Sequence, residues 1–301
     1  MNRKLLYDDV GAVIVTYEPD VDNLAILIEK LSKQVSSIVI VDNASNISFD
    51  FHNVSILKLH TNLGIAEAQN IGIATLIDSG LNNIILFDQD SLPSLTMVHE
   101  LFVTKKEAEK VGIKVAAIGP THIDQDTFQE NIFISAERHS VNKVSANSQL
   151  TSNRKFTQCS FLIASGCLIS KEAIVDIGNM ESKLFIDCVD IEWGFRAVSK
   201  GWSCIGSFEA KMFHKIGEEP LKLMGRSLTT HSPLRHYYFY RNLYSLLKRP
   251  YIPFCWKLHA FVKSSLQAVL FSIFLKPRIQ HFQCILQGVF HGLVNRSGKY
   301  E

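Results

Sequence analysis

Paired cysteines, long apolar runs and a strong net charge are all missing from this chain of 301 residues. The six cysteines include no CxxC pair and the first residues lack the apolar stretch of a signal peptide, so we expect a reduced, cytoplasmic protein. An uncharged, mostly apolar segment at 264–275 is shorter than the roughly 20 residues that cross a bilayer. Repeats and low-complexity tracts are absent, and a net charge of only +2 predicts no nucleic-acid partner.

The small net charge conceals a basic C-terminal tail. Residues 245–301 hold eight Lys and Arg against the single acid Glu301, a balance of +7, which leaves about −5 for the rest of the chain. We therefore expect a catalytic domain at 1–244 and a helical basic appendage at 245–301. Basic residues, Tyr251 and Trp256 around the apolar segment favour a helix that lies in a membrane interface. Packing on the catalytic domain, or on another subunit in a homo-oligomer, is the alternative.

The first half of the chain alternates strand-like and helix-like segments. Continuous apolar strands that alternate with helices predict an α/β fold with a mostly parallel sheet covered on both faces. The polar residues 121–155 are weakly periodic, which favours a surface excursion over core. The expected strands are 11–17, 37–41, 54–59, 83–87 and 115–120, and the expected helices are 21–33, 66–78, 94–111 and 191–200.

Polar residues follow three of the expected strands. In open parallel sheets ligands bind beyond the carboxyl ends of the strands, so Thr16-Tyr17, Asp42-Asn43 and Asp88-Gln89-Asp90 should line one crevice. Two carboxylates separated by one residue offer the oxygen ligands that Mg²⁺ or Mn²⁺ prefers. Acidic pairs at strand ends are also common as solvated turn residues, so the Asp-x-Asp alone is a weak signal.

A second acidic cluster, residues 185–193, lies a hundred residues further on. Its simplest interpretation is a helix start, with acids in the first turn and Glu192 paired with Arg196. His214 follows an apolar run, where a turn would let its imidazole serve as a third metal ligand. A histidine satisfied within the structure is the alternative.

Phosphate-binding loops of the common kinds are absent. Residues 62–72 lack the G-x-G-x-x-G and G-K-[ST] spacings, so a helix preceded by an Asn-x-Gly turn is the safer interpretation. A nucleotidyltransferase, which also acts on sugar nucleotides, would be expected to carry a Gly-rich basic loop after the first strand. Here that position reads Thr16-Tyr17-Glu18-Pro19-Asp20.

Taken in order, the motifs of residues 10–245 resemble those of the inverting family 2 glycosyltransferases, and most of all the bacterial rhamnosyltransferases of O-antigen assembly. Many members of that family have Glu-Asp at the base position, whereas this chain has Val189-Asp190. The matching motifs are Val-Thr-Tyr at 15–17, Val-Asp-Asn-Ala-Ser at 41–45, Asn-x-Gly-x-Ala-x-Ala-x-Asn-x-Gly at 62–72, Phe-Asp-Gln-Asp-Ser at 87–91, Ala-Ser-Gly at 164–166, Phe-Ile-Asp-x-Val-Asp-Ile-Glu-Trp at 185–193, His-x-x-Gly-Glu at 214–218 and Tyr-x-x-Arg-Asn at 238–242.

The resemblance implies a GT-A fold and transfer of L-rhamnose from dTDP-L-rhamnose to a lipid-linked O-antigen intermediate, with Mg²⁺ or Mn²⁺ as cofactor. It implies an enzyme associated peripherally with the cytoplasmic face of the inner membrane. Asp190 takes the place of the catalytic base. The remaining roles are Thr16, Tyr17, Asp42, Asn70, Asp88 and Arg241 for the nucleotide sugar, Asp90 and His214 for the metal, and Glu192 and Trp193 for the acceptor.

Several alternatives stay open at this point. Another nucleotide sugar is one, since thymine and uracil differ by a single methyl group. A nucleotidyltransferase is a second, and an inactive peripheral membrane scaffold is a third. For Trp193 and Glu192 a purely structural role, as helix core and as the partner of Arg196, competes with acceptor binding.

Overall fold

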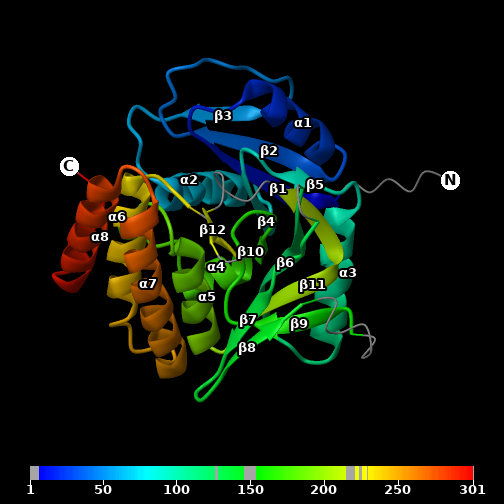
Figure 1. Cartoon of the computed structure of the whole chain (residues 1–301). Helices are drawn as coiled ribbons and strands as arrows, with labels where there is room; N and C mark the ends of the chain where they lie inside the picture. The colour runs from blue at the N-terminus through cyan, green and yellow to red at the C-terminus, as the bar shows by residue number, and fades with distance from the viewer. Residues whose placement is uncertain are drawn as a thin grey trace.

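A nine-stranded sheet forms the centre of the computed structural model, which describes residues 7–125, 128–145, 154–214, 221–223, 226–228 and 230–300 (Figure 1). The strand order is β3-β2-β1-β4-β10-β6-β11-β5, and β9 pairs with β11 outside this path. The bounds are β1 Tyr7–Thr16, β2 Val35–Asp42, β3 Ser55–Lys58, β4 Asn83–Asp88, β5 Leu92–Pro93, β6 Val115–Asp124, β9 Phe156–Cys159, β10 Leu168–Ser170 and β11 Ser203–His214. Two separate hairpins are β7 Phe133–Ala136 with β8 Val141–Val144, and β12 Leu221–Leu223 with β13 Arg226–Leu228.

The sheet is mixed but mostly parallel, as the alternation of segments predicted. Strands β1 to β4 pair with one another in parallel, and so do β6 and β11. Strand β10 lies antiparallel between β4 and β6, while β5 and β9 run antiparallel to β11. The parallel half therefore brings the ends of β1, β2 and β4 to one edge.

Helices cover both faces of the sheet. Successive residues of a strand point to opposite sides, and here both sides carry apolar residues that need covering. In β1, Val13 and Val15 belong to one apolar cluster, and Ala12 and Ile14 to the other. Helices α1 and α3 contribute to the second cluster, and α2, α4 and α5 to the first. The helices are α1 Val21–Leu31, α2 Ile65–Asp78, α3 Met97–Lys110, α4 Lys171–Ile177, α5 Val189–Ser199, α6 Pro233–Leu246, α7 Phe254–Phe274 and α8 Arg278–Leu293.

The described part of residues 121–155 is mostly exposed or half-buried, as its polarity predicted, but it also contributes a few buried residues to the sheet. Strand β6 continues to Asp124, and Thr121 and His122 are buried within it. The hairpin that follows buries Phe133 against the sheet, next to Phe208. A polar residue of this segment can be buried where its hydrogen-bonding group finds a partner inside the protein: the Thr121 hydroxyl donates to the Ser207 carbonyl at 2.8 Å.

Three helices of the C-terminal part lie together beside α5 (Figure 1). Helices α6, α7 and α8 share a small core made of Tyr240, Phe271 and Ile285, one residue from each helix. His236 of α6 and His281 of α8 are joined through their Nδ1 atoms at 3.0 Å. The division expected between residues 244 and 245 falls within α6.

Candidate active site

The polar ends of β1, β2 and β4 meet at one edge of the sheet. Thr16 stands opposite Asp42, and Val15 stands opposite Asp88, in the parallel pairings. Thr16 and Asp42 are buried, and the Thr16 hydroxyl donates to Asp42 Oδ1 at 3.1 Å. Ser45 also donates to this carboxylate through its hydroxyl and its backbone N–H. The sequence-predicted Thr16, Asp42 and Asp88 therefore lie on neighbouring strands of one crevice edge.

Gln89 joins the strand ends, a role that the sequence did not reveal. Its Oε1 accepts from the Tyr17 backbone N–H at 2.8 Å, and its Nε2 donates to the Tyr17 carbonyl at 3.3 Å. The amide thus reproduces the two hydrogen bonds that a further strand residue would make. The Tyr17 side chain itself is 52% exposed at this edge. The available signal was the position of Gln89 between the two predicted aspartates.

Asp88 and Asp90 supply carboxylates at the end of β4. The Asp88 backbone N–H donates to Ser165 Oγ at 3.1 Å, and Ser165 Oγ lies 2.5 Å from Ser91 Oγ, which fixes this turn. Asp88 is half-buried and Asp90 is exposed. Their oxygens fit Mg²⁺ or Mn²⁺ chemically. Among the described residues no group of three His, Cys, Asp or Glu is arranged to hold a metal ion, and the His214 side chain lies outside the described part.

The chain that leads to Asp190 has an unusual backbone. Phe185, Asp187 and Cys188 have φ of 66°, 65° and 62°, in the left-handed region that residues other than glycine seldom adopt. Each such residue costs about 1–3 kcal/mol and persists only where the surroundings enforce it. Residues 185–188, here called the strained segment, end where α5 begins.

Tertiary contacts enforce this conformation from two sides. Asn242 Nδ2 donates to the carbonyls of Leu184, Ile186 and Asp187 at 2.8, 2.7 and 2.9 Å. Phe185 stacks on Tyr238, with ring centroids 4.9 Å apart. On the other side, a Cβ added to Gly64 would lie 2.5 Å from the Phe185 carbonyl oxygen. Asn242 was not predicted as a site residue, although it stands in the Tyr-x-x-Arg-Asn motif.

Two predicted donor ligands, Arg241 and Asn70, are instead engaged inside the protein. Arg241 is buried and donates from Nη2 to the Leu184 carbonyl at 2.8 Å and from Nη1 to the Gly298 carbonyl at 2.5 Å. Asn70 Nδ2 donates to the Met180 carbonyl at 2.9 Å, and its Oδ1 accepts from the Met180 N–H at 2.9 Å. These contacts occupy the polar atoms that donor binding needs. Both side chains support the chain before the strained segment.

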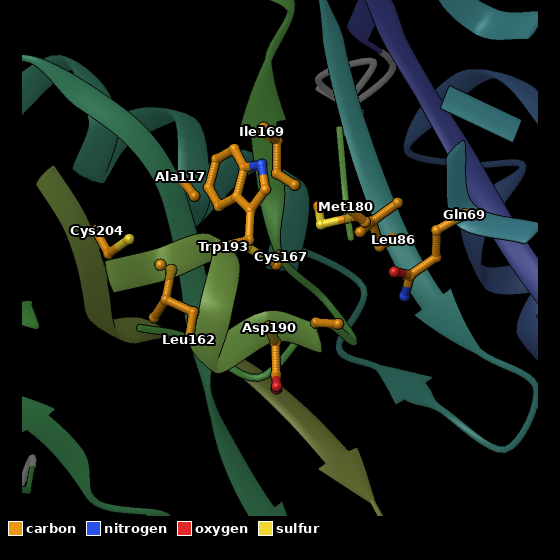
Figure 2. A pocket seen from close by; sticks show the side chains of 12 residues that line it. Gln69, Leu86, Ala117, Leu162, Cys167, Ile169, Met180, Asp190, Trp193 and Cys204 are labelled. Carbon is orange, nitrogen blue, oxygen red and sulfur yellow. The ribbon is translucent and has the colours of Figure 1, made fainter. Parts of the chain in front are cut away.

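Asp190 lies in the first turn of α5, and its carboxyl extends away from the Trp193 indole (Figure 2). Its Oδ1 accepts from the Ile191 N–H at 2.8 Å. A small cavity of about 20 Å³, lined mostly by apolar side chains such as Leu86 and Met180, adjoins it. Burial, followed by the nearby carboxylates of Asp187 and Asp88, raises the pKa of Asp190 to about 6. The two acidic clusters of the sequence therefore meet in one site.

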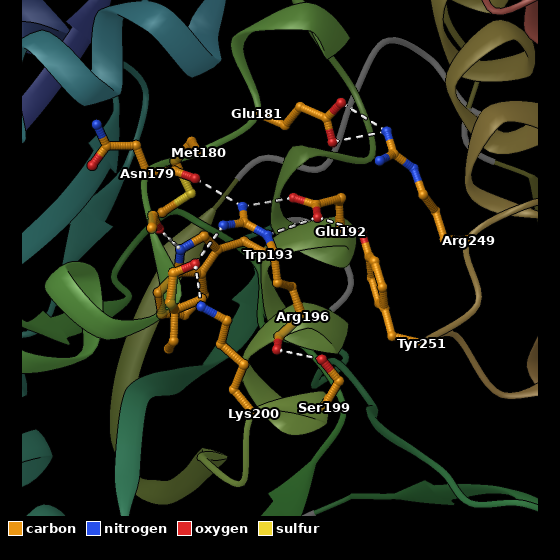
Figure 3. Close-up of polar contacts among 12 residues, drawn as sticks. Asn179, Met180, Glu181, Glu192, Trp193, Arg196, Ser199, Lys200, Arg249 and Tyr251 are labelled. Carbon is orange, nitrogen blue, oxygen red and sulfur yellow. Dashed lines mark hydrogen bonds and ion pairs between the residues drawn. The ribbon is translucent and has the colours of Figure 1, made fainter.

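Glu192 and Trp193 are buried, and Figure 3 shows the polar contacts around them. Both Glu192 oxygens accept from Arg196, at 2.8 and 2.9 Å, and Oε1 also accepts from the Tyr251 hydroxyl at 2.6 Å. The Trp193 indole N–H donates to the Gly178 carbonyl at 2.9 Å. The structural alternative that the sequence left open describes both residues better than the expected acceptor-binding role, because their polar atoms are satisfied within the protein.

No protein-family model matches the chain. The chain is 31% identical over 299 residues to the dTDP-rhamnosyl transferase RfbF of Shigella flexneri. The matched region covers 97% of this chain and 98% of RfbF. Its structure is similar to GalNAc-T7, crystallised with UDP, GalNAc and Mn²⁺ (TM-score 0.59, 13% identity, 80% of this chain and 48% of that one). It is also similar to S. aureus TarS (TM-score 0.56, 12% identity, 93% and 49%).

The chain spans about half the length of these two solved structures, and at this identity the likeness shows the fold alone. That fold, with polar residues at the strand ends, is of the GT-A type. RfbF, which is 31% identical over nearly the whole of both chains, shows the family to which the chain belongs. The chain belongs to the glycosyltransferase family that includes RfbF.

Proposed function

We propose that the protein transfers L-rhamnose from dTDP-L-rhamnose to a lipid-linked O-antigen saccharide, with inversion at the anomeric carbon. The observation that carries the proposal is the convergence of Asp88, at the strand-end edge, with Asp190, whose pKa is raised to about 6. The donor is suggested by the name of RfbF, a dTDP-rhamnosyl transferase.

The strand-end edge supplies the donor side of the proposal. The exposed Tyr17 ring offers a flat surface to the nucleotide base, and the buried Thr16–Asp42 pair forms the floor beneath it. Asp88 binds the ribose. Asp90 and His214 would hold Mg²⁺ or Mn²⁺, and the GalNAc-T7 crystal contains Mn²⁺. When bound, such a cation stabilises the negative charge on the departing diphosphate.

Asp190 acts as the general base in this proposal. The acceptor hydroxyl must lose its proton as it attacks the anomeric carbon, and a single displacement inverts that centre. With a pKa of about 6, Asp190 is ionised at pH 7.5 and is also a stronger base than an ordinary aspartate. Asn242 and Arg241 position it by holding the strained segment.

The tail helices form the membrane-facing surface in this proposal. Within the described ranges no helix is long and apolar enough to cross a membrane. Helices α7 and α8 nevertheless expose apolar residues at helical spacing, and neither contains an acid. Lys257, Lys263, Lys276 and Arg278 favour an anionic lipid surface over a second, equally basic copy of the chain. The exposed residues, here called the apolar helix face, are Phe254, Leu258, Phe261, Val262, Leu266, Val269, Ile273, Phe274, Ile279, Phe282, Leu286, Phe290 and Leu293.

Released nucleoside diphosphate tests the catalytic part of the proposal. The protein is incubated with dTDP-L-rhamnose, a membrane extract that contains lipid-linked saccharides, and Mg²⁺ or Mn²⁺. Acceptor-dependent release of dTDP is expected, and loss of activity in EDTA that either cation restores. Release of pyrophosphate in a parallel incubation with dTTP and rhamnose 1-phosphate would indicate a nucleotidyltransferase instead. No product in that incubation and no release of dTDP with any nucleotide sugar would indicate the inactive scaffold.

Sedimentation with vesicles tests the apolar helix face. Leu258→Glu/Leu266→Glu should reduce recovery with anionic vesicles by about tenfold, since two charges then oppose burial in lipid. The matched control is Val111→Glu/Val175→Glu, since these two residues are 71% and 76% exposed and lie outside this face. Equal recovery of both variants with the vesicles would contradict docking through α7.

A further inference from the structure

A second cavity, of about 420 Å³, adjoins the chain that leads to Asp190. Its walls come from three places: the turn Ser182–Leu184, the end of α6 with the residues after it, and the chain beyond α8. None of the roles assigned above uses it. We call it the basic pocket, and its lining residues are Glu181, Lys183, Leu184, Asn242, Ser245, Lys248, Arg249, Asn295, Arg296 and Ser297.

Positive charge in the basic pocket exceeds negative charge. Four cations face one acid, Glu181, which is already paired with Arg249 at 2.7 and 2.9 Å. Lys248 donates only to neutral groups, the Gly292 and Leu293 carbonyls and Asn295 Oδ1 at 2.7, 3.1 and 2.5 Å. These contacts fix its ammonium group at the end of α8 without neutralising it.

Two further cations, Lys183 and Arg296, are exposed, and neither has an acidic partner within the part of the chain that the structure describes. The pKa of His291 is lowered first by burial and second by the positive charge of Arg296. Unneutralised cations that line a concave, polar space attract anions. Ser245, Asn242 and Ser297 add hydrogen-bonding groups to the walls.

We propose that the basic pocket binds a phosphate or diphosphate group, and that this group belongs to a membrane lipid that carries the acceptor. Leu293 and Val294, both exposed at the end of α8, run directly into Asn295 and Arg296 of the pocket. On its other side, Lys183 stands in the chain just before the strained segment. The pocket therefore adjoins both the end of the apolar helix face and the chain that leads to Asp190. The lipid source rests on the proposed function, whereas anion binding does not.

Calorimetry with inorganic pyrophosphate tests anion binding. EDTA is present throughout, so that a metal at the donor site makes no contribution. Removing two cations by Lys183→Gln/Arg296→Gln should weaken binding by about tenfold or more, because each loses a charge-assisted hydrogen bond. The control Lys106→Gln/Lys110→Gln makes the same charge change on α3 and should bind like the wild type. Equal affinity of the two double variants would overturn the site.

Vesicles that contain farnesyl diphosphate, an isoprenoid diphosphate, test the lipid source. The full chain should bind them at least tenfold more tightly than phosphatidylcholine vesicles alone, and Lys183→Gln/Arg296→Gln should lose that gain. A variant that loses pyrophosphate binding yet keeps the gain would show that the pocket takes a soluble phosphate, which refutes the lipid source. Neither measurement depends on sugar transfer, so failure of the proposed function leaves both results interpretable.

Discussion

Replacing Asp190 by Asn should make the protein more stable while removing its activity. A carboxyl whose pKa rises from 3.8 to about 6 is destabilised in its charged form by the folded structure. At pH 8 that pKa difference corresponds to a loss of about 3 kcal/mol in the free energy of unfolding. Solvent around the half-buried group weakens the effect, so we expect a loss of about 1–3 kcal/mol. Asn keeps the Oδ1 that accepts from the Ile191 N–H and carries no charge. The gain should therefore appear in full above pH 6.

The stability difference between Asp190→Asn and the wild type should depend on pH. Because the folded state holds the Asp190 proton more tightly than the unfolded chain does, the wild type loses stability as pH rises from about 4 to about 6. The variant lacks this loss, so its advantage should shrink to about half by pH 5. Activity should move the opposite way: in the wild type kcat/KM falls as pH drops below about 6, and Asp190→Asn should lower kcat by about 10² to 10⁴ at pH 8.

Urea unfolding followed by tryptophan fluorescence at pH 5 and pH 8 measures the stability, and dTDP release measures the activity. Asp78→Asn serves as the control, since Asp78 is an exposed carboxylate at the end of α2 and its replacement should change stability by less than about 0.5 kcal/mol. A variant no more stable than the wild type at pH 8 would refute the burial argument. A kcat within about tenfold of the wild type would refute the base assignment.

Two further predictions concern the residues around Asp190. Glu192→Gln should lower the free energy of unfolding in urea by about 3 kcal/mol, because it breaks a buried ion pair with Arg196. The KM for the acceptor should stay unchanged, and a rise in that KM would support the acceptor-binding role instead. Asn242→Ala should lower kcat more than it changes the donor KM, because the Ile186 and Asp187 carbonyls lose their side-chain donor and the Leu184 carbonyl keeps only that of Arg241. Asn82→Ala at the opposite end of β4, which also loses a side-chain hydrogen bond, should leave both parameters unchanged.

The parts of the fold that the sequence predicts are those set by local pattern. Apolar runs such as 83–87 give strands, and polar residues directly after them give strand ends. Parallel order then brings Thr16, Asp42 and Asp88 to one edge without any knowledge of side-chain contacts. The crevice was predictable because its position follows from topology alone.

The direction in which a polar side chain points was not predictable in the same way. Arg241 and Leu184 are 57 residues apart, and nothing in either local sequence indicates that a guanidinium binds a carbonyl rather than a diphosphate. The sequence also gives no sign of the strained segment, since Phe185 and Cys188 belong to residue types with no preference for positive φ. Only tertiary packing imposes that conformation, so it appears first in the structure.

The strained segment also changes how the tail is to be understood. Asn242 and Arg241, which hold that segment, belong to α6, and α6 is held in turn by Phe271 of α7 and Ile285 of α8. Arg241 further donates to the Gly298 carbonyl, close to the C-terminus. Removing residues 245–301 would therefore disturb Asp190 as well as any membrane contact. Point variants on the apolar helix face are consequently the sharper test, because they change the lipid-facing surface and leave the packing of α6 in place.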